Sequence, residues 1–129
     1  LLLRNIFILI SRNLIGANRA DNSLENEVEL VMHYFRENYR SEINVEDYAL
    51  SRGMSASNFY RVFKQISGST PLQFILKLRL SNAQNLLENS NLTIAEIASA
   101  VGYENPLYFS RLFHKHIGVS PSEYRKMRT

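Results

Sequence analysis

Two stretches of the sequence carry side chains that could hydrogen-bond to the base edges and phosphates of a nucleic acid. They run from Ser55 to Gly68 and from Asn105 to Gly118, and no acidic residue lies within either. If each is a helix buried on one side, its other side presents hydroxyl, amide and cationic groups, which suit a major groove and its flanking phosphates. The first contact face is Ser57, Asn58, Tyr60, Arg61 and Lys64; the second is Asn105, Pro106, Leu107, Tyr108, Ser110, Arg111, His114 and Lys115.

Arginine and asparagine give these faces a specific chemistry. An Arg side chain can donate two hydrogen bonds to guanine O6 and N7, and an Asn side chain can pair with adenine. A single arginine such as Arg61 is more often part of a solvated helix surface. Because Arg61 and Arg111 occupy matching positions in two similar stretches, the pattern favours DNA contact over a solvated surface.

The two stretches belong to an internal repeat. Ile43–Ala49 matches Leu92–Ala98, 49 positions later, and each segment has an apolar residue, a capping residue and an acid three residues past the cap. This arrangement predicts a helix start with an N-cap, a reciprocal acid and a hydrophobic staple. Gly53 and Gly102 lie 49 positions apart and are predicted to end the two short helices.

The spacing of the repeat becomes 50 after these glycines, so the second turn is predicted to be one residue longer. Phe59 then matches Phe109, and Phe63 matches Phe113. A short helix, a turn containing glycine and a second helix make a helix-turn-helix unit. The sequence therefore predicts two such units, at about residues 44–67 and 93–117. Ile66 and His116 also match, which predicts that His116 lies on the buried side.

One long helix is predicted between the units, over residues 71–89. Thr70 suits the N-cap, Pro71 the first helical position, and Gln73 completes a capping box. At about 1.5 Å per residue the helix would be roughly 28 Å long, against about 34 Å between successive major grooves on one side of DNA. It is therefore predicted to be a rigid spacer. Its apolar face is Leu72, Ile75, Leu76, Leu80, Ala83, Leu86 and Leu87.

Composition and charge agree with an all-α protein that has an anionic partner. The 129 residues include only 5 Gly and 3 Pro, and the net charge is +3. Residues 1–44 carry five basic and six acidic side chains, whereas residues 45–129 carry ten and six, so the excess of positive charge lies in the second part. No cysteine is present, which agrees with a reducing cytoplasm.

The N-terminal part is predicted to be separate from the repeat. Residues 1–17 read as a helix with two apolar stripes, either a dimerisation or interdomain helix of an upstream domain or an ordinary packing helix. Leu1–Ile10 is too short and too interrupted for a membrane span. The polar stretch Gly16–Ser23 predicts a boundary, with residues 1–22 as helix and linker and residues 23–129 as a domain. A helix is expected from Leu24 to Tyr39, buried at Leu24, Val28, Val31, Phe35 and Tyr39.

Residues from about Val28 to Arg128 resemble the DNA-binding domain of the AraC/XylS family of transcription regulators. The most specific part is AEIASAVGYENPLYFSRLFHKHIGVSPSEYRK, from Ala95 to Lys126. The connecting-helix pattern of Pro71, Phe74, Arg79, Ala83 and Leu86-Leu87 also matches the family.

The resemblance implies an all-α fold of seven helices, with two helix-turn-helix subdomains and a long connecting helix. It implies binding to double-stranded promoter DNA in the cytoplasm. It is also compatible with two further partners: RNA polymerase, and a second copy of the chain bound through the N-terminal helix or an upstream domain. By the same alignment, the residues that reach base edges are Ser57, Asn58, Tyr60 and Arg61 in the first unit and Pro106, Leu107, Tyr108 and Arg111 in the second.

The second contact face departs from the family pattern. The side chains of Pro106 and Leu107 cannot donate hydrogen bonds, so this helix is expected to read a thymine methyl group or mainly phosphates. His114 stands where the family usually has Lys, which predicts a weaker, pH-sensitive contact.

Arginines outside the contact faces carry separate predictions. Arg79 lies on the apolar face of the connecting helix and is expected to form a structural ion pair, with Glu96 as one candidate partner. Arg125, Lys126 and Arg128 are equally suited to touching phosphates and to solubilising the end of the chain.

Two other function classes are weighed against DNA binding. A helical protein-interaction module with little or no DNA binding would agree with the mild charge and the apolar first residues. An enzyme is not expected, because the chain has no cysteine nucleophile, no phosphate-binding glycine loop and no metal-ligand pair at helical spacing. No cofactor, metal or membrane partner is expected.

Overall fold

The computed structural model describes residues 19–128, which form seven helices and no strand. The helices are α2 (Arg19–Asn38), α3 (Val45–Ser51), α4 (Ala56–Ser67), α5 (Pro71–Asn89), α6 (Ile94–Ala100), α7 (Pro106–Ile117) and α8 (Pro121–Arg128). The predicted helix at residues 1–17 lies outside the described residues.

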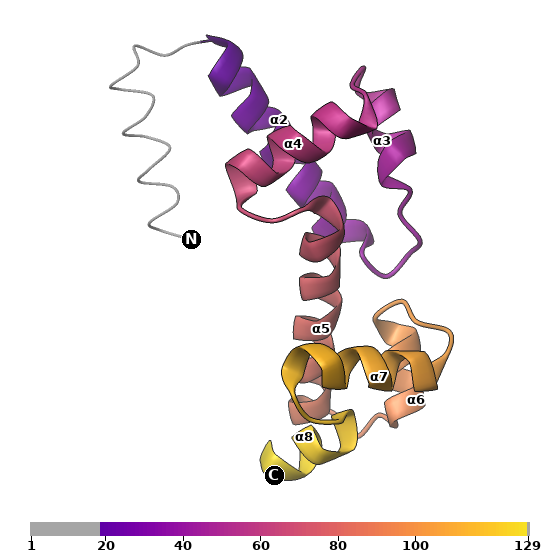
Figure 1. Ribbon diagram of the computed structural model, residues 1–129. Coiled ribbons are helices and arrows are strands. Elements are labelled where there is room, and N and C mark those ends of the chain that lie inside the picture. The colour runs from indigo at the N-terminus through magenta and orange to yellow at the C-terminus, as the bar shows by residue number, and fades with distance from the viewer. Residues whose placement is uncertain (1–18, 129) are drawn as a thin grey trace.

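The long helix α5 joins two groups of helices. Figure 1 shows α2, α3 and α4 at one end of α5, and α6, α7 and α8 at its other end. Helix α4 packs on α2, α3 and α5, while α7 packs on α6 and α8, which both lie against α5. The first unit is defined here as α2 to α4 with their loops, and the second as α6 to α8 with theirs.

The predicted N-caps of α3, α5 and α6 are confirmed. Thr70 Oγ1 accepts from Gln73 N at 3.2 Å, and Gln73 Oε1 accepts from Thr70 N at 2.9 Å, which closes the capping box of α5. The same box opens α6 between Thr93 and Glu96, and the hydrogen bond from Thr93 N lowers the pKa of the Glu96 carboxyl. In α3 only the first half is present, since Asn44 Oδ1 accepts from Asp47 N at 2.9 Å.

Replacing Thr93 by alanine should lower the free energy of unfolding by about 1 kcal/mol, because an N-cap hydroxyl is lost. Urea denaturation followed by circular dichroism measures the change. Ser99→Ala is the control, because Ser99 is exposed on the same helix and caps nothing. A Thr93→Ala loss no larger than that control would contradict the capping role.

Each unit has its own aromatic core. In the first, the buried rings of Phe35 and Phe63 lie 5.8 Å apart, and Phe74 of α5 lies 5.8 Å from Phe63. In the second, Phe113 lies 5.9 Å from Phe109 and 5.6 Å from Tyr124 of α8. The match between the two stretches of sequence is thus a match of buried rings.

Three burial predictions were wrong at single positions. Leu24 is 36% exposed and Leu72 is 57% exposed, because each lies near the start of its helix, where the neighbouring helices do not cover it. His116 is exposed, because the buried side of α7 continues from Phe113 to the half-buried Ile117, four residues on.

Helix α2 also begins at Arg19 rather than Leu24, since a run of polar residues without Gly or Pro does not end a helix.

Candidate nucleic-acid interface

Helices α4 and α7 have the same construction. Each begins at a capping residue, Ser55 or Asn105, and each ends at a glycine with positive φ, Gly68 at 88° or Gly118 at 98°. Their buried sides carry Phe59 and Phe63, or Phe109 and Phe113, so the opposite sides face away from the core. The turn before α4 spans residues 52–55 and the turn before α7 spans 101–105, which confirms the extra residue.

The first contact face lies on the outside of α4, as predicted. Ser57, Asn58, Arg61 and Lys64 are all exposed. Arg61 Nη2 donates to Asn58 Oδ1 at 2.7 Å, so the two base-reading candidates are paired with each other. An adenine contact from Asn58 needs its amide oxygen as well as its nitrogen, because adenine N6 donates and N7 accepts. Because an amide oxygen has two lone pairs, Asn58 Oδ1 can accept from adenine N6 while it also accepts from Arg61.

Tyr60 differs from the other members of this face. Its side chain is half-buried, and burial raises the pKa of its hydroxyl, as does the neighbouring carboxylate of Glu46 on α3. The absence of acids within α4 therefore does not make the whole surroundings of this face free of negative charge. Only the tertiary structure brings Glu46 to Tyr60, since 14 positions separate them in the sequence.

The second contact face is more apolar than the first. Leu107 is 58% exposed and Tyr108 is 55% exposed, and both lie in the first turn of α7. Asn105 Oδ1 accepts from Leu107 N at 3.0 Å and from Tyr108 N at 3.2 Å, so Asn105 is the N-cap of α7. Pro106, Arg111, His114 and Lys115 are also exposed, and Ser110 is half-buried.

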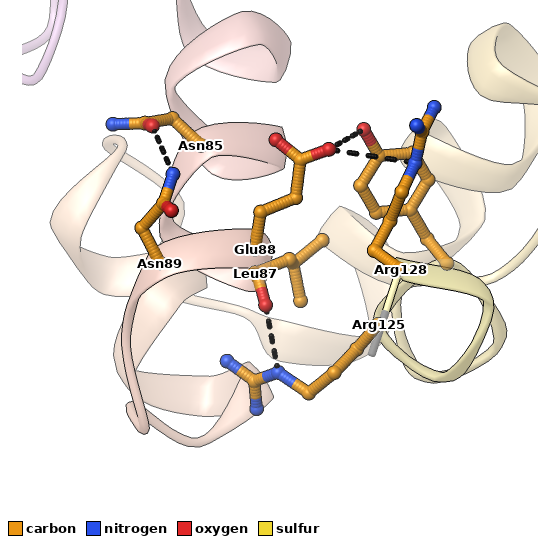
Figure 2. Close-up of polar contacts among 7 residues, drawn as sticks. Asn85, Leu87, Glu88, Asn89, Arg125 and Arg128 are labelled. Carbon is orange, nitrogen blue, oxygen red and sulfur yellow. Dashed lines mark hydrogen bonds and ion pairs between the residues drawn. The ribbon is translucent and has the colours of Figure 1, made fainter.

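The C-terminal arginines hold α8 against the end of α5. Arg125 Nε donates to the carbonyl of Leu87 at 3.2 Å (Figure 2). Its Nη2 donates to the carbonyl of Ser90 at 3.3 Å. Arg128 Nε lies 3.4 Å from Glu88 Oε1, which also accepts from Tyr124 Oη at 3.0 Å. Arg125 and Arg128 thus bind the protein itself, a role that the sequence interpretation missed. The sequence gives only a weak signal for this role, because every residue has a backbone carbonyl and the residue type does not mark which one accepts.

The predicted ion pair of Arg79 with Glu96 is wrong. Arg79 Nε donates to the carbonyl of Tyr39 at 2.8 Å, and its Nη2 donates to the carbonyl of Ser41 at 3.0 Å. Glu96 instead caps its own helix through Thr93. The carbonyls at the end of α2 lack helical partners and accept from a nearby cation. A search for opposite charges in the sequence overlooks such acceptors.

Among residues 19–128, no helix is both long and apolar enough to cross a membrane. The same residues contain no group of three His, Cys, Asp or Glu side chains placed to hold a metal ion.

A family model described as a helix-turn-helix domain matches residues 48–127, which include both contact faces. The chain is 33% identical to the C-terminal domain of AraT, a response regulator from Geobacillus stearothermophilus, with a TM-score of 0.75 over 79% of this chain and 85% of that one. It is 28% identical to a probable AraC family transcriptional regulator from Rhodopseudomonas palustris, with a TM-score of 0.67 over 80% and 97%. The chain belongs to the AraC/XylS family.

Two further relatives of this AraC-type domain extend the comparison. The Msm operon regulatory protein of Streptococcus mutans is 34% identical over 110 residues, which cover 85% of this chain and 38% of that protein. The DNA-binding domain of AdpA, solved in complex with a target DNA, is 32% identical, with a TM-score of 0.72 over 78% of this chain and 90% of that one. The chain spans well under half the length of this curated relative. It contains the AraC-type helix-turn-helix domain of the family.

Proposed function

We propose that this AraC-type domain inserts α4 and α7 into successive major grooves of promoter DNA and binds a specific sequence there. The observation that carries the proposal is the repeated construction: two capped helices, one in each of the two units joined by α5, expose basic sides without an acidic residue. Phosphates would be bound by Lys64 and Lys115, and base edges would be read by Arg61 and Arg111. Exposed Leu107 is suited to a thymine methyl group.

We infer that the domain works in the cytoplasm as the promoter-binding part of a regulator, with RNA polymerase and a second copy as further partners. The structure of the AdpA domain in complex with a target DNA supports DNA binding by a domain of this fold. Selection of duplexes from a random pool by the full-length protein would give the preferred sequence and the spacing of its two half-sites in one experiment.

Replacing Arg61 or Arg111 by alanine should weaken binding to the selected duplex by about 1–3 kcal/mol, or roughly 5- to 150-fold, because each loses a two-donor base contact. Fluorescence anisotropy on the selected duplex and on a random duplex measures the effect. Arg36→Ala is the control, since Arg36 is exposed on α2 outside both contact faces.

Equal losses on the selected and random duplexes would make the two arginines phosphate contacts instead. No loss for either variant would overturn the proposed interface. The interaction-module alternative is tested in the same assay, because a protein that neutralises phosphates must show a falling log K with rising log salt. Absence of any salt-dependent binding would favour that alternative.

A further inference from the structure

Arg79 contacts both helix-turn-helix units at once. On one side it donates to the carbonyls of Tyr39 and Ser41, in the loop that leads from α2 to α3 in the first unit. On the other side its guanidinium carbon lies 4.9 Å from the ring centroid of Tyr103, in the turn between α6 and α7 of the second unit. A half-buried side chain of α5 therefore bridges two segments that are about 60 positions apart in the sequence.

The two units also approach each other directly beside Arg79. A β-carbon on Gly102 would lie 2.9 Å from the carbonyl oxygen of Arg40 and 3.2 Å from the guanidinium carbon of Arg79. At Gly53, the matching position of the first unit, a β-carbon would meet nothing within 4 Å. Both glycines have positive φ, 107° and 76°, so the backbone alone does not distinguish them. The absence of a side chain at position 102 is what lets the second unit pack on the first.

Tyr103, which Arg79 contacts, also packs against the helix that carries the second contact face. Its ring centroid lies 5.8 Å from that of Tyr108 and 5.9 Å from that of Phe109, both in the first half of α7. The loop of the first unit, Arg79, Tyr103 and the start of α7 are thus in continuous contact. Any rotation of one unit about α5 would break hydrogen bonds of Arg79 or separate it from Tyr103.

We propose that Arg79 and Gly102 lock the two units in one relative orientation and so set the half-site spacing that the domain accepts. Arg79 is a positioning residue in this inference, which rests on the two-groove binding proposed above. Its planar guanidinium has donors in fixed directions, so two carbonyls and a ring face define its orientation. Lysine cannot reproduce this geometry, because its three donors all lie on one nitrogen and it has no planar group to stack on a ring.

The chain offers a matched control for Arg79. Arg125 also donates to two carbonyls, those of Leu87 and Ser90, but its bonds lie between α8 and the end of α5 and do not reach the first unit. Arg79→Lys and Arg125→Lys therefore each remove two bonds to backbone carbonyls, but only Arg79 also contacts the second unit from a position bonded to the first, through the ring of Tyr103. Gly102→Ala and Gly53→Ala form a second pair, because both glycines have positive φ and the added β-carbon would clash only at position 102.

The first measurement is DNA binding by these four variants. On a duplex with both half-sites at the preferred spacing, Arg79→Lys should bind about tenfold more weakly. In the wild type the fixed orientation holds the second unit at a high effective concentration near its half-site once the first unit is bound, and the variant loses this advantage. Its affinity for a single half-site should stay unchanged, and one added base pair between the half-sites should cost it less than it costs the wild type. The Arg125→Lys variant should keep the wild-type spacing preference.

The second measurement needs no DNA. Because the chain has no native cysteine, spin labels can be placed uniquely at exposed Gln65 of α4 and Ser122 of α8 through Gln65→Cys and Ser122→Cys. Electron paramagnetic resonance should give a narrow distance distribution that broadens or shifts with Arg79→Lys and with Gly102→Ala, and keeps its width with Arg125→Lys and Gly53→Ala.

The outcomes separate this inference from the proposed function. Unchanged distances in both Arg79→Lys and Gly102→Ala would overturn the lock, whatever the DNA results. Changed distances with an unchanged spacing preference would overturn its link to half-site spacing. If Arg79→Lys fails to fold, the comparison of Gly102→Ala with Gly53→Ala decides the matter. If the wild type binds no DNA, the proposed function fails, and the distances still test the lock between the units.

Discussion

Replacing Asn82 by proline, in the middle of α5, should lower the free energy of unfolding by at least about 3 kcal/mol. Proline removes the backbone N–H that bonds within the helix, and its ring clashes with the carbonyl of Leu78, four residues earlier. That carbonyl also accepts from Asn82 Nδ2 at 2.7 Å, a second bond that the substitution removes. Urea denaturation measures the loss, and circular dichroism shows whether the helix content falls.

The control for this substitution is Asn82→Ala, which removes the same side-chain bond and leaves the backbone bond in place. Where Asn82→Pro stays folded, the kink should also weaken binding to a duplex with both half-sites while leaving single half-site binding intact. Stability and two-site affinity equal to those of Asn82→Ala would show that α5 need not be straight. The rigid-spacer interpretation would then be wrong.

Replacing Phe63 by alanine should lower the free energy of unfolding by about 3–5 kcal/mol, because it leaves a cavity in the first unit. Phe63 is fully buried, and its ring lies 5.8 Å from Phe35, 6.0 Å from Phe59 and 5.8 Å from Phe74. The substitution therefore removes contacts of α4 with α2 and with α5, and one contact within α4, at once. Urea and thermal denaturation both measure the effect.

Leu72→Ala provides the comparison for this core substitution. Leu72 also belongs to an apolar pattern, but it is 57% exposed, so its loss should change the free energy of unfolding by no more than about 0.5 kcal/mol. Comparable losses for the two variants would mean that the core of the first unit is not where the structure places it. DNA binding by Phe63→Ala should fall in parallel with its folded fraction.

Much of the fold could be predicted because its signals are local. The capping box of α5 involves Thr70 and Gln73, three residues apart, and the positive φ of Gly102 follows from its place after a short helix. Period and capping depend only on neighbours in sequence, so the bounds of α3 to α7 follow closely from them. The family was likewise readable from the continuous stretch Ala95 to Lys126.

The candidate site was predicted less completely. Exposure of Arg61 and Lys64 follows from helical periodicity, and their contact with DNA stays a prediction. Glu46 beside Tyr60, by contrast, depends on how α3 packs against α4. The hydrogen bond between Asn58 and Arg61 joins residues three apart, yet the choice of that rotamer was not readable from their spacing.

The sequence by itself determined the two helix-turn-helix units, the helix between them and the basic outer sides of α4 and α7. These features follow from periodicity, capping and composition, which are properties of short segments. Only the tertiary structure decided the role of Arg79, Arg125 and Gly102, because their partners are backbone carbonyls and a close approach of two loops. A carbonyl has the same chemistry at every residue, so only the fold selects which ones an arginine reaches.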